Sequence, residues 1–295
     1  MVSFSTLMLA AAASLAAEAT NIPRGGTSTT PIWNTLPDTP ALPLPISSTL
    51  YPINGVNLWL QKYNEVKGRV PIVMSHGGLG HSAYFAAVIQ ELIKRGHYVI
   101  ASDRRGHGRS TFNSDDKFTF DMFAQDQDAL LKAVGVTKYI FVGWSDGAIQ
   151  GLSALMNPTL AQPIQKAFLF GTTASPNDEN PTFKTNPILS QFITRVAAEY
   201  AQLQPRANFR LFGTKVSELE ASLPNFTPAD FAKVDGTKVT LCEAEHEEAV
   251  IKGTGQKISQ LIRGSKFVTL RGGSHFAPLQ IPGKFADAIE AFLRA

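Results

Sequence analysis

The sequence predicts an α/β fold in which a mostly parallel central sheet is flanked by helices on both faces and carries a helical cap insertion. Two observations lead to this prediction. Short, continuous apolar runs alternate with helical segments along most of the 295 residues, and such runs are typical of parallel strands that are buried on both faces. The alternation stops over residues 172–236, where prolines and helical segments replace the strand-like runs, and it resumes afterwards.

The individual elements follow from hydrophobic periodicity. Residues 56–63 roughly alternate between apolar and polar side chains after the turn at Asn54-Gly55, which predicts a half-exposed strand. The helical segments carry apolar residues three and four positions apart, and several end at a glycine. The other predicted strands are 70–75, 98–101, 139–142, 167–170, 239–241 and 267–270. The predicted helices are 84–95, 120–134, 148–156, 188–203, 250–262 and 282–293.

The N-terminal residues differ in composition from the rest of the chain. Residues 1–19 form an apolar stretch that ends in Ala17-Glu18-Ala19, a small-x-small pattern typical of a signal-peptidase site. We therefore expect a signal peptide and a secreted protein, with an intracellular location as the alternative if this segment is not cleaved. Residues 20–50 are rich in Pro, Ser and Thr and predict an extended N-terminal arm. The predicted core comprises residues 51–171 and 237–295, with the cap at 172–236 between them.

Composition and charge exclude several classes of protein. The chain is 44% hydrophobic and 17% charged, which excludes a disordered or fibrous protein. The net charge is only +3 and the basic residues are scattered, so we expect no nucleic-acid partner. The apolar N-terminal stretch is too short and too rich in alanine to span a bilayer, so no stable membrane association is expected. The single cysteine, Cys242, cannot form an intramolecular disulfide.

A nucleophile motif follows one of the predicted strands. Residues 143–147 read G-W-S-D-G, directly after the strand at 139–142 and directly before a helix. In this strand–turn–helix context a G-x-S-x-G sequence predicts a sharp turn that exposes the hydroxyl of Ser145 as a nucleophile. The flanking glycines are expected because a Cβ there would collide with the neighbouring strand and helix. Trp144, the residue before the nucleophile, is a candidate substrate-binding residue.

A base for Ser145 is predicted among six histidines. Only His275 lies after the last predicted strand and before the last helix. Because loops that follow parallel strands share one edge of the sheet, Ser145 and His275 can meet although they are 130 residues apart. His97 precedes a strand on the opposite edge and is interpreted as structural, whereas His81 follows a glycine loop and is a candidate substrate contact.

A carboxylate should orient the imidazole, and the loop after the strand at 239–241 offers four. Its acidic residues are Glu243, Glu245, Glu247 and Glu248, and spacing alone does not choose between them. Asp178, after the preceding strand, is a weaker alternative.

An oxyanion needs backbone donors as well. One predicted donor is the N–H of Asp146, and the other is the N–H of Gly78, or of Leu79 next to it, in the loop S-H-G-G-L-G at 75–80. This loop lacks both the G-x-G-x-x-G pattern and a P-loop lysine, so it does not predict a phosphate site.

From about residue 51 to the C-terminus, these motifs resemble the α/β-hydrolase superfamily. The matching segments are H-G-G-L-G at 76–80, D-R-R-G-H-G-R-S at 103–110, the elbow at 143–147 and G-S-H-F at 273–276. The chain is most similar to small capped hydrolases with a G-W-S-D-G elbow, which often read G-D-H-D-E-A in the acid loop. Here residues 244–249 read A-E-H-E-E-A. This resemblance implies that Glu247 is the acid, with Glu in place of the commoner Asp and Ala244 in place of Gly.

The resemblance also excludes relatives of the same fold. Dehalogenases and epoxide hydrolases carry Asp at the elbow, and proline iminopeptidases typically read H-G-G-P-G and G-x-S-W-G. We therefore expect a secreted serine hydrolase that acts on an ester or lactone and needs no cofactor or metal. Its substrate is expected to be small and apolar or aromatic, because the cap contains six phenylalanines, at 183, 192, 209, 212, 226 and 231.

Two alternatives remain open at this point. One keeps the Ser145, Glu247 and His275 triad but cleaves a C–C bond in a β-diketone-like substrate or tailors a natural product. The other is a non-catalytic ligand-binding protein with a hydrolase fold.

Overall fold

The computed structural model describes residues 30–295, and the predicted signal peptide at 1–19 lies outside these residues. Eight strands form one sheet in the order β1-β2-β4-β3-β5-β6-β7-β8. Strands β1 and β2 pair antiparallel, as do β2 and β4, whereas every pairing from β4 to β8 is parallel. The predicted α/β fold with a mostly parallel sheet is confirmed. The strands are β1 (Ser47–Ile53), β2 (Val56–Tyr63), β3 (Ile72–Ser75), β4 (Val99–Ser102), β5 (Tyr139–Trp144), β6 (Ile164–Phe170), β7 (Val239–Ala244) and β8 (Lys266–Leu270).

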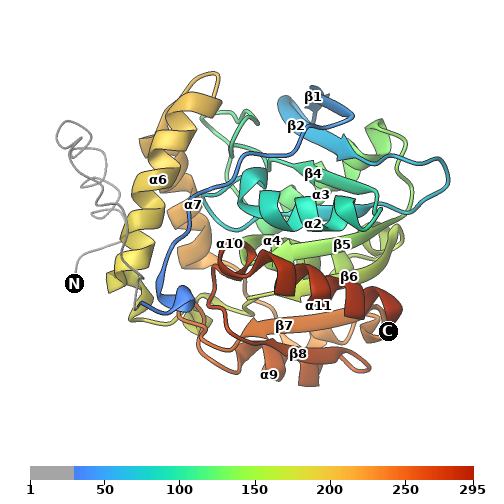
Figure 1. Cartoon of the computed structure of the whole chain (residues 1–295), viewed down its shortest axis with the longest axis vertical. Coiled ribbons are helices and arrows are strands. Elements are labelled where there is room, and N and C mark those ends of the chain that lie inside the picture. The colour runs from blue at the N-terminus through green and yellow to red at the C-terminus, as the bar shows by residue number, and fades with distance from the viewer. Residues whose placement is uncertain (1–29) are drawn as a thin grey trace.

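Helices cover both faces of this sheet (Figure 1). One face packs against α2 (Ala86–Lys94) and α11 (Pro282–Arg294), and the other against α3 (Phe120–Ala133), α4 (Asp146–Met156) and α9 (Thr254–Leu261). Each face has its own apolar core, because the central strands expose almost nothing on either side. Two short helices complete these layers, α5 (Pro158–Ala161) and α10 (Ala277–Gln280).

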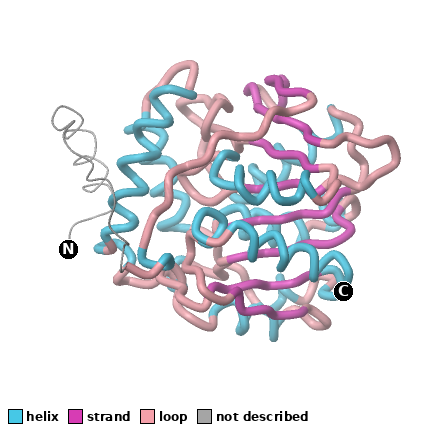
Figure 2. Tube along the Cα trace, viewed as in Figure 1, coloured by secondary structure: helices cyan, strands magenta, loops and turns pink. Residues whose placement is uncertain are grey.

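The segment between β6 and β7 is helical and gathers at one end of the sheet (Figures 1 and 2). Its helices are α6 (Pro187–Leu203), α7 (Phe209–Ser222) and α8 (Pro228–Phe231), with short 3-10 turns at Pro176–Asp178 and Phe183–Thr185. The apolar faces of α6 and α7 join the core on the α2 side of the sheet. We refer to residues 172–236 as the insertion. No helix within residues 30–295 is both long and apolar enough to cross a membrane.

The extended arm is shorter than predicted, because strand formation begins at Ser47 rather than after residue 50. Strand β1 pairs along its whole length with β2, from Ser47 opposite Lys62 to Ile53 opposite Val56. Because β1 contains polar residues and Pro52, hydrophobic periodicity does not predict this strand. Its pairing with β2 determines its conformation. Between residue 30 and β1, the described part of the arm contains a 3-10 turn (Ile32–Asn34).

Strand β2 is more buried than its alternating pattern predicts, since only Asn57 is exposed. The face that was expected to meet solvent is covered by the loop after β4. The guanidinium of Arg109 lies 4.1 Å from the ring centroid of Trp59, and the side chain of Gln61 is buried and donates a hydrogen bond to the hydroxyl of Tyr63. The prediction of a half-exposed strand is therefore wrong.

The helix predicted at 250–262 begins four residues later, at Thr254. Val250 pairs instead with Glu179 of the insertion in an isolated antiparallel bridge. Gly253 then adopts a left-handed conformation with φ of +90° and leads into α9. The bridge to Glu179, which is distant in the sequence, therefore determines the conformation at Val250, where the local spacing predicts a helix.

Candidate active site

Ser145 lies on a sharp turn between β5 and α4. Its backbone angles, φ +54° and ψ −121°, fall outside the regions that L-residues ordinarily occupy, and its N–H donates to the carbonyl of Phe170 at 2.8 Å. A Cβ on Gly143 would collide with the backbone of Gly147, and a Cβ on Gly147 would collide with the carbonyl of Ser75. Both glycines are therefore required by close backbone contacts, as the G-x-S-x-G pattern predicts.

His275 and Glu247 form a buried pair. Nδ1 of His275 lies 2.8 Å from Oε1 of Glu247, and the same carboxylate oxygen accepts the N–H groups of Ala249 (3.0 Å) and Val250 (3.1 Å). These bonds fix the carboxylate in place despite the extra methylene of glutamate. Because Nδ1–H donates to Glu247, Nε2 of the neutral ring is left as the basic nitrogen.

The other acidic candidates make different contacts. Glu243 accepts two backbone N–H groups around the start of α9, and Glu245 accepts one from the loop after β8. Asp178 accepts two N–H groups within the insertion. Glu248 contacts the same loop as the imidazole but bonds the backbone N–H of His275, at 2.8 Å, rather than its ring. Geometry thus places only Glu247 of these five acids on the imidazole.

The charges around the imidazole favour its protonated form. Burial opposes a positive charge on His275, but Glu247, Glu248 and Asp146 outweigh this effect and raise its pKa above the usual value. An imidazolium that forms by proton transfer would therefore be stabilised where it forms.

The hydroxyl and the imidazole face one cavity. Ser145 and His275 both line it, and among the described residues no hydrogen bond joins the Ser145 hydroxyl to the His275 ring. Such bonds are often long before substrate binds. The other predicted site residues line the same cavity: Gly78, Leu79, Trp144 and Asp146.

The loop at 76–80 is held by a buried arginine. Arg104 donates to the carbonyl of His76 at 2.5 Å and to the carbonyl of Gly77 at 2.8 Å. Since a trans peptide is planar, the N–H of Gly78 points away from the carbonyl of Gly77 and hence away from Arg104. The N–H of Asp146 stands in the first turn of α4, where helix N–H groups lack an intrahelical acceptor. Neither the helix nor Arg104 therefore uses these two N–H groups.

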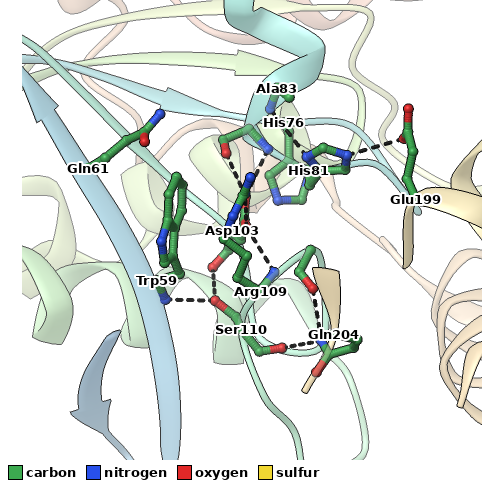
Figure 3. A network of polar contacts seen from close by, with 12 residues as sticks. Trp59, Gln61, His76, His81, Ala83, Asp103, Arg109, Ser110, Glu199 and Gln204 are labelled. Atoms are coloured by element: carbon green, nitrogen blue, oxygen red, sulfur yellow. Dashed lines mark hydrogen bonds and ion pairs between the residues drawn. The ribbon is translucent and has the colours of Figure 1, made fainter. Parts of the chain in front are cut away.

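The turn at 103–110 is the centre of a network of polar contacts (Figure 3). The carboxylate of Asp103 accepts the N–H and hydroxyl of Ser82 with one oxygen and the N–H and guanidinium of Arg109 with the other. Gln204, from the end of α6, donates to carbonyls of the same turn, including that of Ser110 at 2.6 Å. The turn therefore ties the insertion to the sheet and contributes no side chain to the cavity.

Two histidines are structural in their contacts. His81, a candidate substrate contact from the sequence, is absent from the described cavity lining and instead lies 3.2 Å from Glu199 of α6 (Figure 3). Tyr84 donates to the same carboxylate at 2.9 Å. His97 pairs with Glu290 of α11, in agreement with its structural interpretation.

Sequence reasoning did not identify two residues beside the site. Gly171 has a φ of +67°, and a Cβ there would lie 2.8 Å from Cε1 of His275. Glu220 lines the cavity from α7. Phe212, Val216 and Glu220 are spaced four residues apart, so Glu220 lies on the apolar face of α7. A carboxylate on such a face is the feature of the sequence that could have identified this residue.

Comparisons with known proteins agree with this architecture. The chain is 33% identical over 139 residues to the serine hydrolase BPHL of Homo sapiens, and the match covers 46% of each protein, so it spans less than half of that relative. It is 25% identical over 272 residues to the bifunctional esterase/perhydrolase DCH of Acinetobacter calcoaceticus, covering 82% of this chain and 98% of the relative.

A similar fold occurs among solved structures. The enol-lactonase from Burkholderia xenovorans LB400 superposes with a TM-score of 0.66 at 17% identity, covering 84% of this chain and 100% of the other. Residues 70–223, more than half of the chain, match the alpha/beta hydrolase fold family itself. The chain therefore belongs to the alpha/beta hydrolase fold family.

Proposed function

We propose that this protein is a serine hydrolase that cleaves a carboxylic ester or lactone through an acyl-enzyme on Ser145. The observation that carries the proposal is that Ser145, on its strained turn, and His275, held by Glu247, line the same cavity. A nucleophile, a base and an acid that orients the base are the three parts that this chemistry requires.

The proposed reaction has two steps. In the first, Nε2 of His275 takes the proton from the Ser145 hydroxyl while Oγ attacks the carbonyl carbon, and the N–H groups of Gly78 and Asp146 hold the oxyanion. The imidazolium then gives its proton to the departing alkoxide, which leaves an acyl-serine. In the second step, a water molecule loses a proton to His275 and attacks the acyl carbon; the imidazolium then gives this proton to the departing Oγ, which releases the acid and restores Ser145.

The cavity lining favours a small apolar or aromatic substrate. The insertion contributes Phe183, Leu189 and Phe192, and the core adds Phe120 and Ile149. We therefore propose that the insertion acts as a cap over the substrate. The remaining insertion phenylalanines pack internally, among them the ring of Phe212, stacked on Tyr200 at a centroid distance of 4.7 Å.

Two further observations support the proposal. The relative from Acinetobacter calcoaceticus is named an esterase, and its match extends over nearly its whole length. The G-W-S-D-G elbow, which occupies the turn between β5 and α4, supports placement among the small capped hydrolases that share this motif.

The test is hydrolysis of a panel of short aryl esters, alkyl esters and lactones by the wild-type protein and by Ser145→Ala. We expect turnover by the wild type and a loss of about 10³-fold or more in the variant. Ser190→Ala, at an exposed position in α6, is the control and should keep full activity. An ester hydrolysis rate that Ser145→Ala leaves unchanged would contradict the proposal.

The same panel separates the alternatives. Faster cleavage of a β-diketone than of any ester would assign the site to C–C hydrolysis. Ligand binding without turnover, unchanged by Ser145→Ala, would indicate a binding protein.

Export is proposed on the sequence of residues 1–19 alone. Expression of the full chain with its native N-terminus, followed by N-terminal sequencing of protein from the medium, tests it. Mature protein that starts at Thr20 is the expected result, and full-length protein confined to the cells would contradict it.

A further inference from the structure

A second carboxyl group faces the elbow from the insertion. Glu220 of α7 lines the cavity, and no hydrogen bond or ion pair joins it to another residue of the described chain. A Cβ placed on Gly78 would lie 2.5 Å from Oε1 of Glu220 and 3.0 Å from Oδ2 of Asp146. The two carboxyl groups therefore approach the same point beside Gly78, in the loop at 76–80.

Asp146 gives an independent indication of an unfilled polar site. Its side chain lines the cavity, the residue is only 4% exposed, and Oδ2 has no hydrogen-bond partner among the described residues. The nearest cation, the guanidinium of Arg104, lies 3.6 Å from Oδ2. A buried carboxylate oxygen without a donor is unfavourable unless a ligand or a shared proton satisfies it.

The surrounding charges assign the proton to Glu220. Burial raises its pKa well above the usual value, the neighbouring Asp146 and Glu179 add to the rise, and Arg104 and Lys184 oppose it only in part. Burial also raises the pKa of Asp146, but Arg104 and His275 oppose that rise directly. Two adjacent carboxyl groups in a poorly hydrated site cannot both ionise readily, so one of them keeps its proton.

We propose that Glu220 is the protonated member and Asp146 the ionised member of this carboxyl pair, and that the O–H of Glu220 donates a hydrogen bond to an acceptor oxygen of the substrate near the scissile carbonyl. This inference rests on the proposed hydrolase function and deepens it, since it makes Glu220 a specificity-determining residue. The class of substrate is an ester with a keto, hydroxyl or ether oxygen close to the carbonyl, on either the acyl or the alcohol side.

The chemistry of the pair supports a neutral donor rather than a binding site for an ion. With the proton on Glu220, the pair carries a single negative charge on Asp146, which the guanidinium of Arg104 balances. The rest of the lining near Ser145 is largely apolar. In such surroundings an O–H that meets an acceptor oxygen discriminates strongly against a substrate in which a methylene replaces that oxygen, because the buried donor is then left unpaired.

The test compares matched substrates that differ by one oxygen. On the acyl side, the 4-nitrophenyl esters of methoxyacetic and butyric acid have the same number of chain atoms; on the alcohol side, so do 2-methoxyethyl and butyl esters of one acid. For each pair the ratio of kcat/KM is measured in the wild type, Glu220→Gln and Glu220→Leu. Comparing ratios between proteins cancels the intrinsic reactivity of each ester.

We expect Glu220→Leu to lower the oxygen-to-methylene ratio about tenfold for one of the two pairs, which identifies the side that carries the acceptor. Glu220→Gln keeps a donor and should stay within about threefold of the wild-type ratio. Glu218, exposed on the same helix, provides the matched controls Glu218→Gln and Glu218→Leu, which should not change either ratio. A ratio in Glu220→Leu equal to that of the wild type for both pairs overturns the inference, and so does a Glu220→Gln protein that behaves like Glu220→Leu.

Failure of the proposed function gives a different result. Ester turnover with unchanged ratios removes only the role of Glu220, whereas absence of turnover on every ester removes the hydrolase proposal. In that case, calorimetric binding of methoxyacetanilide and butyranilide to the Ser145→Ala protein and its Glu220→Leu derivative makes the same comparison without chemistry. Equal loss of affinity for both anilides, or none for either, then overturns the inference.

Discussion

The carboxylate of Glu247 lies 2.8 Å from Nδ1 of His275 and accepts two further N–H groups with the same oxygen. This single oxygen connects the acid loop after β7 with the loop after β8. It selects the ring tautomer, orients the imidazole and stabilises its positive charge. Among the side chains described around the imidazole, Glu247 contributes most to raising its pKa.

Replacement of Glu247 by Gln should therefore lower kcat by about 10³- to 10⁴-fold, because the tautomer and the charge stabilisation are both lost. Glu243→Gln is the matched control, since Glu243 bonds only backbone N–H groups near α9. Steady-state kinetics on the best ester of the panel measure the effect. Equal activity of the two variants would show that Glu247 is not the orienting acid.

The pH dependence should follow His275. Its pKa is raised above the usual value mainly because Glu247 outweighs the effect of burial. Only the neutral ring can accept a proton, so kcat/KM should rise with pH through this raised pKa and reach a plateau above it. The residual activity of Glu247→Gln should show the same rise at lower pH. A wild-type midpoint below that of an ordinary histidine would disagree with this account.

A side chain at position 171 should impair catalysis as well as strain the backbone, because it would contact the ring of His275. Gly171→Ala places a Cβ 2.8 Å from Cε1 of His275 at a φ of +67°, whereas Gly135→Ala introduces a Cβ at a similar φ of +77° with nothing within 4 Å. Both variants should lose about 1–2 kcal/mol in the free energy of unfolding, measured with denaturant. Only Gly171→Ala should also lower kcat/KM, and a similar activity of both variants would contradict the close packing of the ring.

The hydrogen bonds to Asp103 should contribute strongly to the free energy of unfolding. Four donors from Ser82 and Arg109 converge on its buried carboxylate. Asp103→Asn should lower the free energy of unfolding by about 2–4 kcal/mol, since an amide cannot accept all of them. Asp115→Asn, at an exposed position, should change it by less than about 0.5 kcal/mol. Thermal melts of both variants provide the comparison. A loss of stability in Asp103→Asn as small as that in Asp115→Asn would show that these hydrogen bonds contribute little to the free energy of unfolding.

The sequence predicted the parts of the site that follow strand order. Ser145 directly follows β5, and Glu247 and His275 lie in the loops after β7 and β8; the carboxyl ends of such parallel strands meet at one edge of the sheet. Local motifs and strand order therefore indicated Ser145 and His275. For the acid, spacing left four glutamates of one loop open, the family resemblance indicated Glu247, and the contact with the imidazole distinguishes it in the structure.

The features that the sequence did not reveal depend on contacts between distant segments. Strand β1 looks like a polar, proline-containing arm until it pairs with β2. Gly171 is needed because of a ring from residue 275. Glu220 resembles an ordinary helical carboxylate until α7 packs over the oxyanion loop. Periodicity can mark Glu220 as a carboxylate on the apolar face of α7, but the contact partners in these three cases have no local period, so periodicity and motif spacing cannot predict the contacts.

The most direct test of the central claim is covalent labelling of the purified protein with a fluorophosphonate, followed by intact-mass measurement and peptide mapping. The account predicts a single adduct on the Ser145 hydroxyl, formed about 10²-fold or more slowly in His275→Gln. An unchanged mass after prolonged exposure, or an adduct on another residue with Ser145 unmodified, would contradict it.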